Sequence, residues 1–253
     1  MWLVVCHSTD PAALWAYEGL SQRALAPLVL VTSETLGCSR RWEHRLGRGG
    51  CIVDITLADG TRIESRQVRG TLNRIQWIPP EMLAVGVPED QLYASQELYA
   101  FFMGWLYSLP SPLLNEPTPQ GLSGRWRYPS EWQSLAGQAG LRTRPFRISA
   151  RSHDAVNAAF VDTSVVHPGR RTVIVLAGEV VGDDVPPEVS AGCRHLAELA
   201  ETLLLGVDFD VATDGAWVFA GAGVSPDLRW GGAAFLDKLA SLFHRPGSAL
   251  ERS

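Results

Sequence analysis

The chain has 253 residues, with a hydrophobic fraction of 46% and a charged fraction of 19%. These values are typical of a globular protein with a sizeable core and exclude a largely disordered chain. The formal net charge of −5 excludes a broad basic footprint, so we expect no nucleic-acid partner. No apolar run approaches the roughly 20 residues that span a bilayer, and the N-terminus lacks the features of a signal peptide. We therefore expect a cytoplasmic protein without a membrane partner.

The N-terminal segment predicts a parallel β-α-β unit. Met1–Cys6 is an apolar run rich in β-forming residues, which predicts a buried strand. Asp10 and Pro11 are suited to the N-cap and first position of a helix over Ala12–Leu25. Leu28–Thr32 predicts the next strand, and strand, helix and strand at this spacing favour parallel pairing.

A hairpin and a further strand complete the predicted N-terminal sheet. Cys51–Leu57 alternates in polarity and returns over Thr61–Ser65, and Val68–Asn73 predicts another strand. The basic run Arg40–Arg45 is interpreted as a solvated loop, with a grip on an acidic peptide or a phosphate as the alternative. Residues 1–80 therefore predict a small open-sheet α/β domain.

The middle of the chain predicts helices. Aromatic and aliphatic residues cover most of the surface of Leu92–Leu109, so we expect this helix to be largely buried. The alternative is that part of it forms a homodimer interface, because aromatic residues are enriched in interface cores. Pro129–Gly140 predicts a second helix, and Arg144–Ala150 predicts a strand.

The C-terminal part combines strands, a long helix and a hairpin that turns at Asp214-Gly215. Its predicted elements are the strand Arg171–Leu176, the helix Pro187–Leu205, the hairpin strands Phe209–Thr213 and Ala216–Ala220, and the closing helix Phe235–Phe243.

The order of four stretches along the chain can be compared with the order of motifs in known families. They are Val68–Pro79 with its Asn73-Arg74 pair, Leu114–Pro117 after the aromatic helix, Gly121–Ser149, and the strand, helix and hairpin of Arg171–Val224. This order resembles the ATP-grasp superfamily, and within it the ligases that crosslink ribosomally made peptides in microviridin-type macrocycle formation.

The resemblance implies an α/β fold in three parts. The expected parts are an N-terminal, Rossmann-like pre-ATP-grasp domain at 1–80, a helical linker with the ATP-grasp entry segment at 81–149, and a shortened ATP-grasp-like α+β domain at 150–253. The last domain is expected to be shortened because Ser152–Arg170 is too short for the family's glycine-rich lobe.

Departures from the family pattern bear on catalysis. The resemblance implies ATP and Mg²⁺, with lysines and with carboxylate or amide metal ligands around the transferring phosphoryl group. A family member reads roughly Phe-Leu-Glu-Val-Asn-Pro at the closing hairpin, whereas Gly221 and Gly223 stand at the ligand positions of Phe219–Val224. Glycine offers no side-chain ligand, and the only lysine, Lys238, lies outside the motif. We therefore expect no metal site.

Arginines are the candidates for phosphate contacts, because a guanidinium binds phosphate in bidentate fashion. The candidate catalytic set is Arg125, Arg147, Arg171 and Asp210, with Arg127, Arg151 and Arg170 expected nearby. The alternative, which is favoured, is that these arginines are solvated surface residues.

Candidate ligand-binding residues lie in two places. Asp227, Arg229 and Trp230 stand in a loop beside two glycines, although the first two residues can equally pair with each other. His7 follows the first strand, where open α/β sheets bind ligands. A helix-capping role for His7 and its neighbours is the favoured alternative.

Two functions remain open at this point. The leading hypothesis is a degenerate ATP-grasp-like pseudoenzyme that binds a peptide, protein or small-molecule ligand as a subunit in peptide or natural-product biosynthesis. The alternative is an active ATP-dependent carboxylate–amine ligase that uses arginines for its phosphate contacts, or an ATP-free enzyme on the same scaffold.

Overall fold

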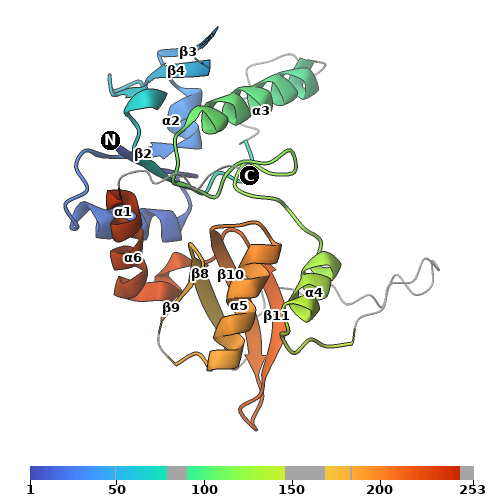
Figure 1. Ribbon diagram of the computed structural model, residues 1–253. Coiled ribbons are helices and arrows are strands. Elements are labelled where there is room, and N and C mark those ends of the chain that lie inside the picture. The colour runs from blue at the N-terminus through green and yellow to red at the C-terminus, as the bar shows by residue number, and fades with distance from the viewer. Residues whose placement is uncertain (49, 79–89, 146–168, 183, 246–253) are drawn as a thin grey trace. The chain divides into compact units, whose positions relative to one another are not determined.

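The computed structural model describes residues 1–253 except 49, 79–89, 146–168, 183 and 246–253 (Figure 1). The chain divides into two compact units. The first comprises Met1–Trp126 and Asp227–Ser253, and the second comprises Arg127–Pro226. The last segment of the chain therefore returns to the unit in which the chain begins. The predicted three-part division at residues 80 and 149 stays a prediction.

A parallel sheet in the order β2-β1-β6-β7 forms the centre of the first unit. Its strands are β1 Trp2–Cys6, β2 Leu28–Thr32, β6 Gly70–Asn73 and β7 Leu113–Leu114. Every residue of β1 is buried, as expected for a central parallel strand that is covered on both faces. The predicted strands and the parallel pairing of β1 with β2 are confirmed.

Asp10 starts helix α1, Pro11–Ser21, as predicted. Its Oδ1 accepts hydrogen bonds from the backbone N–H groups of Ala12 at 3.0 Å and Ala13 at 3.1 Å. Its Oδ2 accepts from Nε of Arg74 at 2.7 Å, and the Arg74 side chain is only 6% exposed. One carboxylate therefore joins the start of α1 to the chain that leaves β6.

The closing helix α6, Gly232–His244, packs against α1. A Cβ at Gly19 would lie 2.4 Å from Cδ1 of Leu236, so a larger residue here would force the Leu236 side chain to shift. Short elements complete the first unit: α2 Ser33–Gly37, the 3-10 helix η1 Ser65–Gln67 and the 3-10 helix η5 Leu228–Gly231.

A second, antiparallel sheet in the order β3-β4-β5 belongs to the same unit. Its strands are β3 Arg41–Gly47, β4 Gly50–Thr56 and β5 Arg62–Glu64. The prediction of a loop at Arg40–Arg45 is therefore wrong. Trp42 and His44 alternate with the charged residues and stack against Phe101, with ring centroids 4.8 and 4.1 Å away. Burial of this apolar side outweighs the charge of the run.

Helix α3, Gln91–Ser108, covers the small sheet. Phe102, Trp105 and Leu106 are fully buried, whereas Leu92 and Tyr93 are more than 60% exposed. The prediction of a largely buried helix therefore holds for one side of its C-terminal half and is wrong for its first turn.

The second unit is an antiparallel sheet in the order β11-β10-β8-β9, with helices α4 and α5 packed against it (Figure 1). Its elements are α4 Pro129–Gln138, β8 Arg170–Leu176, β9 Glu179–Val181, α5 Pro187–Leu199, β10 Leu204–Val211 and β11 Trp217–Gly223.

The predicted hairpin at Asp214-Gly215 is confirmed, but α5 ends at Leu199 and not at Leu205. Glu201 has a φ of +52°, which breaks the helix, and Leu204 already belongs to β10. Arg144 lies outside any strand, and most of the predicted strand Arg144–Ala150 falls outside the described residues. The fold as a whole is mixed α/β, with one parallel and two antiparallel sheets. None of its described helices is long and apolar enough to cross a membrane.

Candidate functional site

The candidate catalytic face is the side of the β8–β11 sheet that turns away from the apolar cluster of α4 and α5. Asp208 on β10 pairs across the strands with Thr172 on β8 and Gly221 on β11. The Thr172 hydroxyl donates a hydrogen bond of 2.6 Å to Asp208 Oδ1. Since cross-strand neighbours share a face, Asp208 stands directly opposite one of the two positions where the family resemblance expects a metal ligand.

Open space lies at both glycine positions. Among the described residues, and apart from the chain neighbours, the only atom within 4 Å of a Cβ built at Gly221 is Oδ2 of Asp208, at 4.0 Å, and nothing lies within that distance at Gly223. The β-bulge between Asp208 and Phe209 sets this register. Side chains at residues 221 and 223 would therefore fit beside Asp208 without steric conflict with the described residues, but glycine supplies no ligand atom at either position.

The residues of this face do not fit a magnesium ion. Mg²⁺ requires an octahedral set of hard oxygen ligands, usually including one or two carboxylates. Asp208 is a single carboxylate, and Gly221 stands opposite it. Within the described parts of the chain, no group of three or more His, Cys, Asp or Glu side chains could hold a metal.

Asp210 shares this face with Asp208 but is held by two arginines. Arg144 Nη2 donates to Oδ2 at 2.7 Å, and Arg170 Nε donates to Oδ1 at 3.3 Å. Both carboxylate oxygens thus have a cationic partner, and Arg170 is mostly buried. A carboxylate in this arrangement is suited to ordering the strands more than to binding a second cation.

Within the second unit, the predicted Arg171 is not one of the arginines that contact Asp210. Arg171 lies on the opposite face of the sheet, where its guanidinium stands 5.8 Å from the ring centroid of Trp217. Arg125 is exposed and belongs to the first unit, while Arg147 and Arg151 fall outside the described residues. Arg170, which was expected only as a neighbour, contacts the candidate Asp210 together with Arg144.

The side chain of Arg127, just before α4, makes contacts within the second unit. Its side chain is buried, and Nη2 donates a 2.9 Å hydrogen bond to the carbonyl oxygen of Ala200. Its guanidinium also lies 5.1 Å from the ring centroid of Trp132. These contacts join the start of α4 to the end of α5.

His7 lies beyond the carboxyl end of β1 and has one free ring nitrogen. Its Nδ1 is 2.9 Å from Oγ of Ser33, and that hydroxyl donates its hydrogen to Glu34. The Nδ1 atom must therefore carry the proton and donate, which leaves Nε2 as an acceptor. Nε2 is buried and has no hydrogen-bond partner among the described residues, and the ring stacks on the half-exposed Trp77 at 4.1 Å.

Burial and hydrogen bonding determine the protonation states of His7 and Glu34. Burial lowers the pKa of His7, although Glu34 and Asp10 act in the opposite direction. Burial acts to raise the pKa of Glu34, but hydrogen bonds from backbone N–H groups and the Ser8 hydroxyl lower it to about 2. We infer a neutral imidazole beside an ionised carboxylate at neutral pH. The favoured capping role of His7 is not observed, since Asp10 caps α1.

Asp227 and Arg229 form an ion pair at η5. Arg229 Nε and Nη2 donate to the two carboxylate oxygens of Asp227 at 2.8 and 2.6 Å. This pairing holds the pKa of Asp227 below its usual value, with a smaller contribution from Arg74. Trp230 is 70% exposed beside the pair. The same pairing with Asp227 raises the pKa of Arg229, with a smaller contribution from Asp10.

Asp208 is the residue of interest that sequence reasoning missed. Two residues of the hairpin that turns at Asp214-Gly215 could have indicated it: the carboxylate of Asp208 in the first strand and Gly221 in the second strand. Assigning the two to each other requires the register, and the bulge shifts that register by one residue.

Several solved structures share this architecture. Macrocyclase MdnB from Microcystis aeruginosa MRC is 16% identical, with 95% of this chain and 94% of that chain covered and a TM-score of 0.63. MdnC from the same organism, bound with precursor peptide MdnA, is 12% identical, with 91% and 93% covered and a TM-score of 0.65. A Chryseobacterium gregarium RiPP-associated ATP-grasp ligase in complex with ADP and a leader and core peptide is 8% identical, with 95% and 96% covered and a TM-score of 0.67.

The chain therefore has the fold of ATP-grasp ligases that act on ribosomally made peptides, which confirms the predicted resemblance at the level of the fold. No protein-family model matches the sequence, and no curated protein matches it.

We expect the free energy of unfolding to decrease as the pH falls below about 6.5, the usual pKa of an unfolded histidine. Burial lowers the folded-state pKa of His7 and of His44. The unfolded chain therefore binds more protons than the folded chain as the pH falls, and this shifts the equilibrium toward unfolding. Urea unfolding at pH 7.5 and pH 5.5 measures this difference. His7→Gln should reduce it, and the control His195→Gln, at an exposed position, should leave it unchanged. An identical pH dependence in His7→Gln and the wild-type chain would contradict this assignment.

Proposed function

We propose that this protein is an ATP-grasp-like pseudoenzyme that binds a peptide and serves as a subunit in the biosynthesis of a modified peptide. The observation that carries the proposal is the pairing of Asp208 with Gly221, which leaves one carboxylate where a ligase needs a set of metal ligands. The likeness to ligases solved with a precursor peptide or with leader and core peptides supports the choice of ligand class.

Loss of the metal ligands bears directly on acyl-phosphate chemistry. Charge accumulates on the transferring phosphoryl group, and fixed cations must stabilise it in the transition state. The chain has one lysine, in α6, and glycine at both hairpin positions. The carboxylate of Asp210 is already neutralised by Arg144 and Arg170. In the described part of the chain, the face that would hold ATP and Mg²⁺ therefore has no lysine, its two arginines are paired with Asp210, and it offers no set of metal ligands.

Under this proposal the domain plan follows the family. Residues 1–80 form the pre-ATP-grasp-like domain, 81–149 the helical linker and entry segment, and 150–253 the shortened ATP-grasp-like domain. Peptide contacts are assigned to the edge of the first unit that holds His7, Asp227, Arg229 and Trp230. That edge offers a buried acceptor nitrogen, a polarised ion pair and an exposed indole.

Restoring the family's ligands should restore metal binding if their loss explains the site. In Gly221→Glu/Gly223→Asn, the new carboxylate and amide fill open space beside Asp208. Isothermal titration with MgCl₂ should show saturable binding at least about tenfold tighter than in the wild-type chain. The matched control Gly221→Ala/Gly223→Ala should bind no better than wild type. Adding Asp208→Asn to the restored variant should remove the gain, and a gain that survives this change would contradict the role given to Asp208.

Peptide binding can be measured without knowing the natural ligand by selecting binders from a displayed library of random peptides. Trp230→Ala should weaken the selected peptides at least about tenfold, because exposed aromatic side chains often provide the dominant contacts of an interface. Tyr93→Ala removes an equally exposed aromatic ring from α3 and is the matched control. Failure to select any peptide, or unchanged affinity in Trp230→Ala, would count against the proposal.

A further inference from the structure

A cavity of about 470 Å³ opens in the first unit where the strands of its parallel sheet begin. It is lined by Trp2 at the start of β1, by the residues that precede β6 and β7, and by the end of α6. A volume of this size is typical of pockets that hold small organic molecules. His7 follows the other end of β1, so the cavity is separate from the edge to which peptide contacts are assigned.

Contacts between distant segments hold the walls of this cavity. The indole Nε1 of Trp2 donates a 3.3 Å hydrogen bond to the carbonyl oxygen of Phe243, and the backbone N–H of Thr71 donates to the carbonyl oxygen of Pro112 at 2.9 Å. A Cβ at Gly70 would lie 2.8 Å from Cδ1 of Phe243, so β6 and α6 are in close contact. The cavity is therefore present before a ligand binds, which lowers the entropic cost of binding.

The two arginines that line the cavity have no acidic partner in the described part of the chain. Arg69 precedes β6 and Arg245 follows α6, and among the described residues no carboxylate lines the cavity. Neither guanidinium forms an ion pair or a side-chain hydrogen bond with a described residue. The cavity is therefore suited to an anion.

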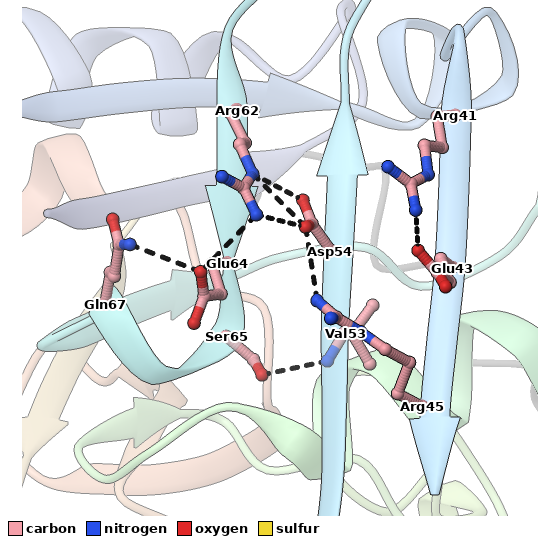
Figure 2. A network of polar contacts seen from close by, with 9 residues as sticks. All are labelled: Arg41, Glu43, Arg45, Val53, Asp54, Arg62, Glu64, Ser65 and Gln67. Carbon is pink, nitrogen blue, oxygen red and sulfur yellow. Dashed lines mark hydrogen bonds and ion pairs between the residues drawn. The ribbon is translucent and has the colours of Figure 1, made fainter.

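Arginines of the small antiparallel sheet differ in this respect (Figure 2). Nη2 of Arg45 lies 3.4 Å and Nε of Arg62 lies 2.9 Å from carboxylate oxygens of Asp54. The charges of these arginines are compensated within the fold, whereas no described carboxylate compensates Arg69 or Arg245.

An aromatic contact holds the Arg69 side chain. Its guanidinium carbon lies 5.4 Å from the ring centroid of Trp2, which is within the range of a cation–π contact. Stacking on an aromatic face uses the plane of the guanidinium and leaves the N–H groups at its rim available to an acceptor. Trp2 is only 6% exposed and is anchored by its own hydrogen bond to α6. Arg69 therefore provides positioned donors of the kind that bind a phosphate or a carboxylate in bidentate fashion.

Two further polar side chains line the cavity. Ser111 is exposed and provides a hydroxyl donor. Nδ1 of His244 donates to the carbonyl oxygen of Ala240 at 2.8 Å, which leaves Nε2 outside that bond. The C-terminus of a helix carries partial negative charge that repels an anion. Here the His244 bond and the Trp2 bond to Phe243 occupy two carbonyl oxygens near the end of α6, which reduces this repulsion.

We propose that this cavity binds a small organic phosphate, with the phosphoryl group held by Arg69 and Arg245 and the organic part against the apolar walls. A phosphomonoester carries a charge of about −1.5 to −2 at neutral pH and three acceptor oxygens. This charge matches two guanidinium groups, and the Ser111 hydroxyl supplies a further donor. A carboxylate leaves one arginine uncompensated, and inorganic phosphate makes no use of the apolar walls at Val68 and Phe243.

This inference does not depend on the proposed function, because the cavity and the peptide-binding edge lie at opposite ends of β1. Helix α6 begins beside η5, which carries Arg229 and Trp230, and ends at the cavity. The two sites therefore belong to one unit but use different side chains, and separate variants distinguish them.

Isothermal titration of the full chain with phenyl phosphate at pH 8 tests the assignment. Phenyl phosphate should bind saturably and at least about tenfold more tightly than benzoate or inorganic phosphate, because only phenyl phosphate combines the double charge with an apolar ring. Arg69→Gln and Arg245→Gln should each weaken this binding at least about tenfold, because each removes a charged bidentate donor. The control Arg66→Gln removes the same charge from an exposed position of η1 that does not line the cavity, and it should change nothing.

Trp230→Ala, which tests the peptide-binding edge, should leave the binding of phenyl phosphate unchanged. The proposal would be overturned by a lack of saturable binding, by equal affinity for benzoate or inorganic phosphate, or by an equal loss in Arg66→Gln or Trp230→Ala. Should a glutamine variant fail to fold, Ser111→Asp decides the question from an exposed position. Its added negative charge should abolish binding, and unchanged binding in that variant would refute the site.

Discussion

The register of the hairpin β10–β11 is the constraint on which the functional account depends. A β-bulge after Asp208 brings this carboxylate opposite Gly221, and the Thr172 hydroxyl fixes its orientation from the other side. Among the described residues there is room for a side chain at both Gly221 and Gly223. What differs is side-chain chemistry, since a single carboxylate cannot supply the coordination that magnesium demands.

A second organising group is the carboxylate of Asp10 in the first unit. It caps α1, binds the buried Arg74, and influences the pKa values of His7 and Arg229. Candidate ligand-binding residues that are far apart in the sequence thereby share one electrostatic environment. Removing a buried partner of this kind leaves an uncompensated charge, so the edge depends on Asp10 for both its structure and its charge.

Local signals made much of the fold predictable. The apolar run of β1, the Asp10-Pro11 helix start and the Asp214-Gly215 turn each have a local cause, and the structure contains all three. Charge misled the interpretation of β3, because the apolar alternation of Trp42 and His44 matters only once α3 is packed beside them. The end of α5 was misplaced because Leu204 and Leu205 suit a helix as well as a strand.

The candidate site was less predictable, because it depends on which residues face each other. Asp208 is a candidate site residue because it pairs with Gly221. Arg171 does not contact Asp210, because adjacent residues of a strand point to opposite faces of the sheet. The resemblance to the ATP-grasp family put Gly221 and Gly223 at the ligand positions, but it did not point to the carboxylate opposite Gly221.

The measurement that tests the central claim most directly is isothermal titration of the wild-type chain with ATP, with and without Mg²⁺. The account predicts no magnesium-linked increase in affinity, because Asp208 faces glycines and Asp210 is held by two arginines. Tight binding of ATP that requires Mg²⁺ would contradict it. Such a result would mean that arginines and the remaining carboxylates rebuild a nucleotide site, and that the protein is an active ligase.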